Sequence, residues 1–387
     1  MNHKEFLLHP TICSLPWIGV YIEPNGDVKN CGVSATKLGN LHSDTLEHCV
    51  TGAVNQQIKN DMIMKVAHPR CNACYKVENL AHNRSINESN RSWYKKFGLV
   101  SDMNIYDSSS HFDLSVLDLR WRNTCNQACV YCGPDLSSKW AQELNDWRWV
   151  IDDQVIEQNK HWIFNQLHKI KHVYLAGGEP LVMKENQELL TKLYQVNPDV
   201  EIRINTNLST LDTPVYRLLQ QFHDVKWTVS VDAVEDSYEY IRWPGNWHKF
   251  CENLKVLQSH SQNINFNMVW CALNAFDIFD CIDFLNSIGC HENMYIIQCL
   301  SKPSELDVRN LPADQIHNLK QAIQQRQHCA DPSLWLAKCL NSMYNFLHTE
   351  FVPNLDQTQK FLHTLDQRRR LDSQKVFAHV YHENHTQ

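Results

Sequence analysis

The chain has 387 residues, of which 43% are hydrophobic and 20% charged, an ordinary globular composition that excludes a disordered protein. It carries 36 Lys and Arg against 43 Asp and Glu, and this formal net charge of −7 disfavours a nucleic-acid partner. No stretch approaches the roughly 20 apolar residues of a membrane span. The N-terminal MNHKEFLLHP has no apolar signal-peptide core, so we expect a cytoplasmic protein without a membrane partner.

Residues 1–85 are rich in turns and are predicted to form a separate N-terminal module. The segment VYIEPNGDVKNCG predicts a β-hairpin, because alternating apolar residues flank Asn25-Gly26, a pair that provides the positive φ of a tight turn. The polar stretch at 86–112 is predicted to be a linker.

From residue 113 to 300 short apolar runs alternate with helical periods. The runs lie at 114–119, 172–176, 200–204, 227–231, 264–270 and 294–297. Six strands alternating with helices predict an α/β domain with a parallel sheet. A partial (β/α)6 barrel suits this length, and an open doubly wound sheet is the alternative.

Residues 301–387 are predicted to be a helical C-terminal region. The run Arg368-Arg369-Arg370 is interpreted as a solvated face that complements a helix macrodipole.

The fifteen cysteines are expected to be reduced, and patterned cysteines in a reducing compartment are metal ligands or catalytic thiols first. Two groups are patterned. One is Cys13, Cys31 and the C-x-x-C pair Cys71 and Cys74; the other is C-x3-C-x2-C, formed by Cys125, Cys129 and Cys132. The remaining cysteines are interpreted as packing residues: Cys49, Cys251, Cys271, Cys281, Cys290, Cys299, Cys329 and Cys339.

Three thiolates on one loop can bind three irons of a cubane cluster and leave the fourth iron open to a substrate or cofactor. The run CNQACVYC after LDLRWRNT resembles the C-x3-C-x-aromatic-C signature of the radical S-adenosylmethionine (SAM) superfamily. Downstream, Ala-Gly-Gly-Glu-Pro at 176–180 resembles the GGEP motif of that family, and YEYIRWPGNW resembles its Y-x-x-I-R segment. Leu208 stands where many members have glycine.

The resemblance implies a [4Fe–4S] cluster on the three-cysteine loop and SAM bound to its open iron. It also implies SAM-binding positions at the aromatic residue of the motif and at successive strand ends, which form the site edge in parallel β/α folds. These positions are Tyr131, Gly177, Gly178, Glu179, Asn205, Asn207, Ser230, Asp232, Arg242 and Val269.

In such enzymes an electron from the reduced cluster breaks the C5′–S bond of SAM, giving methionine and a 5′-deoxyadenosyl radical that takes hydrogen from a substrate C–H bond. An electron donor such as flavodoxin or ferredoxin is then expected as a partner. No catalytic side chain is assigned.

The N-terminal set resembles SPASM and twitch modules, in which a hairpin cysteine and a C-x-x-C pair hold an auxiliary Fe–S cluster. The resemblance implies one auxiliary [4Fe–4S] cluster with Cys13, Cys31, Cys71 and Cys74 as ligands, and a zinc site with the same four ligands is the alternative.

The sequence therefore predicts a radical SAM enzyme that modifies a peptide or natural-product precursor. Oxidation of a sugar or alcohol is the second possibility, and a non-catalytic zinc-binding adaptor is the alternative of another class.

Overall fold

The computed structural model describes residues 1–34, 36–80, 90–291, 294–331 and 334–381. The chain divides into two compact units. The first contains residues 1–125, 134–205 and 212–226; the second contains residues 126–133, 206–211 and 227–387.

The strands of the first unit follow the order β3-β2-β1-β4-β5-β6. They are β1 (Gly19–Ile22), β2 (Asp27–Lys29), β3 (Gly39–Asn40), β4 (Val116–Leu119), β5 (His172–Leu175) and β6 (Glu201–Thr206). β1 and β2 form the predicted antiparallel hairpin, with Gly26 at φ +83° in its turn. β1 also pairs in parallel with β4, so the hairpin extends the sheet of the α/β fold.

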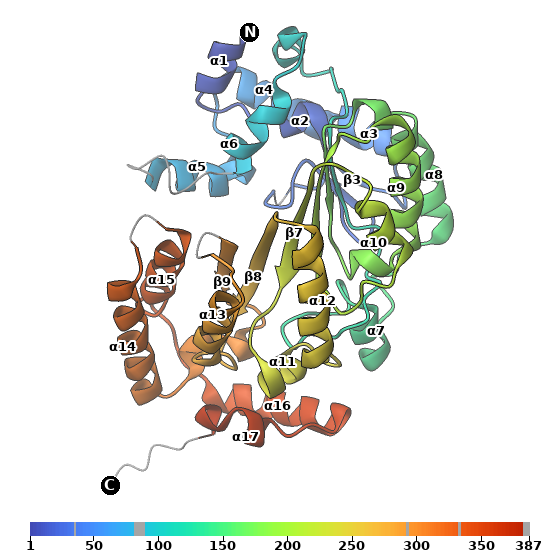
Figure 1. The fold of residues 1–387 in the computed structure, drawn as a ribbon. Helices are drawn as coiled ribbons and strands as arrows, with labels where there is room; N and C mark the ends of the chain where they lie inside the picture. Colours follow the sequence, from blue (N-terminus) through green and yellow to red (C-terminus); the bar gives the residue numbers. More distant parts are fainter. Residues whose placement is uncertain (35, 81–89, 292–293, 332–333, 382–387) are drawn as a thin grey trace. The chain divides into compact units, whose positions relative to one another are not determined.

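Helices cover one side of these strands (Figure 1). The helices that follow β4 are α7 (Ser138–Leu144), α8 (Asp153–Phe164), α9 (Lys184–Val196) and α10 (Pro214–Leu219), with short 3-10 turns η4 (Leu167–Lys169) and η5 (Pro180–Val182). α9 buries Leu189, Leu190 and Leu193 and follows η5, which begins at the proline of the GGEP segment. Its leucines recur at the spacing of one helix face, which explains why this segment forms an amphipathic helix.

The N-terminal part of the first unit is mainly helical. Its elements are α1 (His3–Leu8), α2 (Leu15–Ile18), α3 (Leu46–Thr51), α4 (Ala53–Ile63), η1 (Pro69–Cys71), α5 (Asn72–Leu80), α6 (Asn90–Tyr94), η2 (Lys95–Gly98) and η3 (Met103–Asp107). The last three elements lie in the stretch that the sequence predicted as a linker, whose residues 86–89 fall outside the described part. Phe97 and Tyr106 of this stretch are buried.

The second unit has parallel strands in the order β7-β8-β9, namely β7 (Val225–Ser230), β8 (Ile264–Trp270) and β9 (Tyr295–Cys299). Its helices are α11 (Glu235–Ile241), α12 (Trp247–His260), α13 (Asp277–Ser287), α14 (Ala313–Cys329), α15 (Trp335–Phe346), α16 (Leu355–Arg369) and α17 (Ser373–Val376), with turns η7 (Ser304–Leu306), η8 (Val308–Asn310) and η9 (Ala378–Val380). The parallel α/β fold and the helical C-terminal region agree with the sequence prediction.

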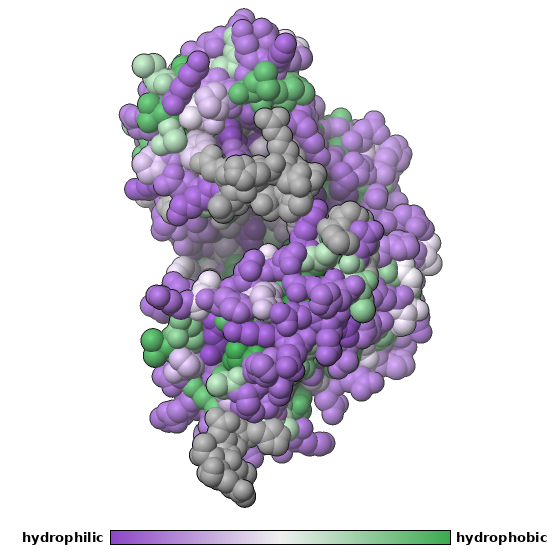
Figure 2. All heavy atoms as spheres, turned by 90° about the vertical axis from the view of Figure 1, so that its left-hand side faces the viewer, coloured by the Kyte–Doolittle hydropathy of each residue, from purple (hydrophilic) through white to green (hydrophobic). Residues whose placement is uncertain are grey.

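No helix in the described ranges combines the length and apolarity needed to cross a membrane. On the face drawn in Figure 2, hydrophilic side chains predominate and apolar ones gather in small, separate patches.

Candidate functional site

The four N-terminal cysteines line one cavity in the first unit. Cys13 precedes α2, Cys31 follows β2, and Cys71 and Cys74 lie in η1 and α5. The remaining lining is largely apolar and includes Leu15, Val33 and Ala73, with Arg70 and Arg91 also present. Segments that are 40 residues apart in the sequence therefore bring their thiols to a single place.

The thiols of this cavity influence one another. Burial raises the pKa of Cys13 well above its ordinary value, and the charges of Cys31, Cys71 and Cys74 raise it further. Burial likewise raises the pKa of Cys31 to about 11 and that of Cys71 to about 12. Backbone N–H groups of Val33 and Ser34 act in the opposite direction on Cys31, because they donate hydrogen bonds that favour its thiolate.

This donor set suits an iron–sulfur cube. Four cysteine sulfurs around an apolar cavity can each bind one iron, and backbone N–H donors stabilise the sulfur charge. In the described ranges, no three His, Cys, Asp or Glu side chains are grouped as a single metal ion would require.

The GGEP segment packs against the start of the three-cysteine loop in the first unit. Gly178 lies so close to Thr124 that a Cβ atom would be 2.0 Å from the Thr124 carbonyl oxygen. The Glu179 N–H donates to the same oxygen at 2.8 Å, and the buried Glu179 carboxylate accepts from Leu181 N–H at 3.0 Å. Gly177 has φ +106°, a conformation that favours glycine.

Cys125 is fixed by the first turn of α7. Its N–H donates to Ser138 Oγ at 3.1 Å, and the same hydroxyl donates to the Cys125 carbonyl oxygen at 3.1 Å. The Ser138 N–H donates to the Asn123 carbonyl at 2.7 Å. The sequence analysis did not single out Ser138; the recognisable capping signal is the preceding Ser137, the N-cap of α7, whose side chain accepts a hydrogen bond from the Trp140 N–H.

In the second unit, the segment that carries Cys129 and Cys132 is bound to the end of α11. The Ala128 N–H donates to the Trp243 carbonyl oxygen at 2.6 Å, and the Val130 N–H donates to the Ile241 carbonyl oxygen at 2.8 Å. These backbone bonds hold both cysteines against the residues around Arg242.

A buried network stands next to these cysteines. Arg242 Nη2 and Asp232 Oδ2 are 2.8 Å apart, and the two side chains are 4% and 1% exposed. The Tyr131 hydroxyl donates to Asp232 Oδ2 at 2.7 Å and accepts from Arg242 Nη2 at 2.8 Å. The Val269 N–H donates to Asp232 Oδ1 at 2.7 Å. Tyr131, Asp232, Arg242 and Val269, which the sequence placed far apart, therefore meet.

The charges of this network act on Cys129. Burial raises the pKa of its thiol, and the Arg242 guanidinium partly offsets that effect. Arg242 also has a buried Nε for which the described residues provide no hydrogen-bond partner. A guanidinium with a spare donor is the group that a carboxylate binds best, so these residues fit the methionine carboxylate of SAM.

In the second unit, the segment after β6 is joined by side-chain hydrogen bonds to the residue that follows Cys125. Asn207 Nδ2 donates to Asn126 Oδ1 at 2.9 Å, and Asn126 Nδ2 donates to Ser209 Oγ at 2.7 Å. Leu208, between these residues, is fully buried and adopts φ +54°, where glycine would be unstrained. Of the remaining predicted positions, Asn205 lies on β6 in the first unit and Ser230 is buried at the end of β7.

The C-terminal region contributes a residue that the sequence analysis placed wrongly. Arg368 and Arg370 are exposed as predicted, but Arg369 is buried, and its guanidinium lies 4.9 Å from the centre of the Trp243 ring. Its charge lowers the pKa of Cys129. Adjacent arginines point in different directions on a helix, so one of three can be buried while its neighbours are solvated.

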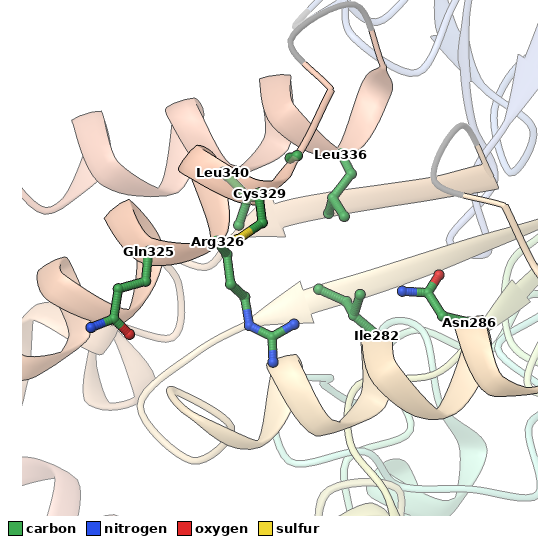
Figure 3. A pocket seen from close by; sticks show the side chains of 8 residues that line it. Ile282, Asn286, Gln325, Arg326, Cys329, Leu336 and Leu340 are labelled. Atoms are coloured by element: carbon green, nitrogen blue, oxygen red, sulfur yellow. The ribbon is translucent and has the colours of Figure 1, made fainter.

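A separate pocket lies where α13, α14 and α15 meet (Figure 3). Ile282, Leu336 and Leu340 provide apolar walls, while Arg326 reaches from α14 and pairs with Asp283 of α13 at 2.6 Å. Cys329, which was predicted to be a packing residue, is exposed at this pocket, so that prediction was wrong. None of the predicted cluster or SAM residues lines it.

Comparison with protein families distinguishes between iron–sulfur clusters and structural zinc as the metal centres of the cysteine groups. A model of the radical SAM superfamily matches residues 121–285, and a model of an iron–sulfur cluster-binding domain, SPASM, matches residues 13–75. The chain carries a radical SAM domain and a SPASM module. Domains of these two kinds bind SAM and [4Fe–4S] clusters, so the predicted cofactor classes are confirmed, and a purely zinc-binding adaptor does not account for the matches.

Two curated relatives of this radical SAM protein are GTP 3′,8-cyclases. The one from Nautilia profundicola is 30% identical over 83 residues, covering 21% of this chain and 24% of the relative. The one from Campylobacter lari is 23% identical over 165 residues, covering 42% and 48%. The chain thus spans less than half the length of each.

Among solved structures, native anSMEcpe with bound AdoMet and Cp18Cys peptide matches at TM-score 0.38 and 15% identity, covering 55% of this radical SAM protein and 60% of that chain. Streptococcus suis SuiB bound to S-adenosylmethionine matches at TM-score 0.36 and 14% identity, covering 72% and 60%.

Proposed function

We propose that this radical SAM protein is an enzyme that removes hydrogen from a C–H bond of a peptide substrate. Cys125, Cys129 and Cys132 would hold the [4Fe–4S] cluster that binds SAM. The observation that carries the proposal is the buried Arg242, which lies beside Cys129 and keeps its Nε without a hydrogen-bond partner in the described chain.

When bound, the cluster and SAM supply the one-electron cleavage that yields methionine and a 5′-deoxyadenosyl radical. The chain's own residues have other tasks. Arg242 would bind the methionine carboxylate, and Asp232 and Tyr131 hold the guanidinium in place through the bonds described above. The glycines of the GGEP segment allow a close approach of backbone and ligand.

Cys13, Cys31, Cys71 and Cys74 would hold an auxiliary cluster with no open iron, whose task is electron transfer or substrate positioning. A peptide substrate is proposed because the N-terminal cysteine set resembles modules found in peptide-modifying enzymes. A reduced flavodoxin or ferredoxin would supply the electron.

The test is anaerobic reconstitution of the full chain with iron and sulfide, followed by reduction with dithionite and measurement of 5′-deoxyadenosine from SAM. We expect Cys129→Ala to abolish SAM cleavage because it removes a ligand of the reactive cluster. Cys74→Ala should lose iron but retain cleavage in part. Cys329→Ala, at an exposed cysteine without a predicted ligand role, is the matched control and should behave as wild type.

Equal loss of SAM cleavage in the Cys129 and Cys74 variants, with both folded, would contradict the assignment of two distinct clusters. Colourless protein that retains only zinc would refute the enzyme. Deuterated candidate peptides then test the substrate class, because hydrogen abstraction transfers deuterium into 5′-deoxyadenosine, which mass spectrometry detects.

A further inference from the structure

The two faces of the sheet in the first unit differ in chemistry. Pairing between neighbouring strands aligns Tyr21 with Asp118, Asp118 with Tyr174, and Tyr174 with Arg203. Residues aligned in this way share one face, and the residues before and after them lie on the other. We call Tyr21, Asp118, Tyr174 and Arg203 the polar row.

The opposite face is apolar. Its aligned residues are Val20, Leu117, Val173 and Ile202, and Ile22, Leu119, Leu175 and Ile204, each at most 2% exposed. Central parallel strands that are packed on both faces are normally apolar throughout. A charged row on the inner strands therefore departs from what packing alone requires, and the partial exposure of Tyr174 and Arg203 shows that solvent reaches it.

Arg203 is the cation of this row that lacks an anion. Within the described chain it forms no ion pair, and its buried Nε has no hydrogen-bond partner. Its guanidinium instead lies 4.8 Å from the centre of the Trp93 ring. The acid two residues earlier on β6, Glu201, is already paired with Lys226 Nζ at 2.6 Å and with Lys96 Nζ at 3.3 Å.

A second guanidinium, that of Arg120, follows directly after β4. Arg120 Nε is 3.5 Å from Asp118 Oδ1, which is too long for a hydrogen bond, and both atoms are buried without a hydrogen-bond partner in the described chain. Arg120 lies against the rings of Tyr21 and Tyr174, at 5.0 and 5.9 Å from their centres. Burial raises the pKa of Asp118 to about 7, so this carboxylate only partly balances the two arginines.

The same face borders both features of the proposed function that belong to the first unit. Arg120, which lies against the Tyr21 and Tyr174 rings, is next to the GGEP segment, because a Cβ on Gly177 would lie 3.1 Å from Arg120 Cβ. Tyr21, the end of the polar row on β1, is next to the auxiliary-cluster cavity, because a Cβ on Gly32, beside Cys31, would lie 3.0 Å from its ring, and the charge of Asp118 acts on Cys31. The polar row and Arg120 therefore lie close to both the GGEP segment and the cavity.

We propose that the polar row binds an oxyanion of the substrate, a carboxylate or a phosphate, through the guanidinium of Arg203 with the help of Arg120. Guanidinium groups form paired hydrogen bonds with both kinds of anion, and the Tyr174 hydroxyl adds a neutral donor. The inference deepens the proposed function, on which it rests, by naming the chemistry of the substrate that would lie along this face.

The test uses the full, reconstituted chain and two probes, glutarate and inorganic phosphate, with glutaramide as the uncharged analogue. Binding is measured by isothermal titration calorimetry. We expect Arg203→Gln to weaken binding of at least one anionic probe about tenfold or more, while glutaramide does not bind. The matched control is Arg217→Gln in the same unit, where an exposed arginine pairs with Asp212, and it should leave binding unchanged.

The two arms identify the source of the anion: tighter binding of glutarate points to a carboxylate of a peptide, and tighter binding of phosphate points to a phosphorylated substrate. Equal binding by wild type and Arg203→Gln overturns the inference. SAM cleavage is measured on the same samples. Loss of anion binding with SAM cleavage intact supports the site, whereas Arg203-dependent binding in a wild-type protein that cleaves no SAM retains the site and rejects the proposed function.

Discussion

Replacing Asp232 with asparagine tests the buried network beside Cys129. The carboxylate accepts hydrogen bonds from the Tyr131 hydroxyl and the Val269 N–H at 2.7 Å, forms an ion pair with Arg242 at 2.8 Å, and is buried. Asp232→Asn keeps the acceptor for the Val269 N–H. It removes the charge that balances Arg242, however, and it directs an amide N–H donor at the Arg242 and Tyr131 groups.

The expected cost follows from the burial of the pair. Removing one partner of a buried ion pair destabilises a protein by about 3–5 kcal/mol, because the other charge stays behind without compensation. For a unit of this size, that cost lowers the melting temperature by roughly 6–20 °C. The matched control is Asp212→Asn, which breaks the exposed pair with Arg217; such pairs contribute about 0–1 kcal/mol.

A double variant separates charge imbalance from general damage. If the uncompensated guanidinium causes the loss, Asp232→Asn combined with Arg242→Met should be more stable than the sum of the two single changes predicts, by about 1–3 kcal/mol. The measurement is urea unfolding followed by tryptophan fluorescence. The reasoning fails if Asp232→Asn costs no more than Asp212→Asn, or if the two single effects simply add.

For three further substitutions, the structure predicts the direction of the effect. Gly178→Ala places a Cβ 2.0 Å from the Thr124 carbonyl oxygen, so we expect loss of iron from the three-cysteine loop in an iron assay, with no such loss in Gly289→Ala, where the new Cβ meets no atom within 4 Å. Leu208→Gly relieves about 1 kcal/mol of left-handed strain but deletes a fully buried side chain worth about 2–5 kcal/mol, so urea unfolding should show net destabilisation, and a net gain would show that strain dominates. Burial lowers the pKa of Lys59 from 10.5 to about 8. The unfolded chain then binds more protons at this group between these values, so the free energy of unfolding of the wild type relative to Lys59→Met should rise from about pH 8 to 10.5, and a difference that does not change with pH would contradict the lowered pKa.

Local patterns were enough to predict the strands and the hairpin. The six apolar runs overlap β4 to β9, and the Asn25-Gly26 turn forms where positive φ was needed, because both signals depend on residues close in sequence. The burial of Arg369 and of Phe97 was not predictable in this way, since Arg369 packs on Trp243 and Phe97 packs on His172, and both partners are distant in the sequence. Nothing in the spacing of the arginine run distinguishes its middle member.

The polar row was also only partly predictable from local patterns. Asp118 and Arg203 each alternate with apolar neighbours, which is the pattern of a strand with one wet face. That pattern reveals a polar face but not the alignment of four strands, which sets Asp118 and Arg203 in one row with a tyrosine between them. That Arg203 has no anionic partner in the described chain becomes clear only from the structure, which shows that the nearby Glu201 is paired with other residues.

At the two cysteine sites, different groups counteract the rise in thiol pKa that burial causes. Burial raises thiol pKa values at both, so binding of iron must displace protons from groups that hold them tightly. At Cys31 the opposing influence comes from backbone N–H groups, which no side-chain substitution removes. At Cys129 it comes from the Arg242 and Arg369 guanidinium groups, one after α11 and one on α16. The C-terminal helices therefore belong to the electrostatics of the radical SAM loop, and the chemistry of that loop depends on residues well outside the segment that carries the motif.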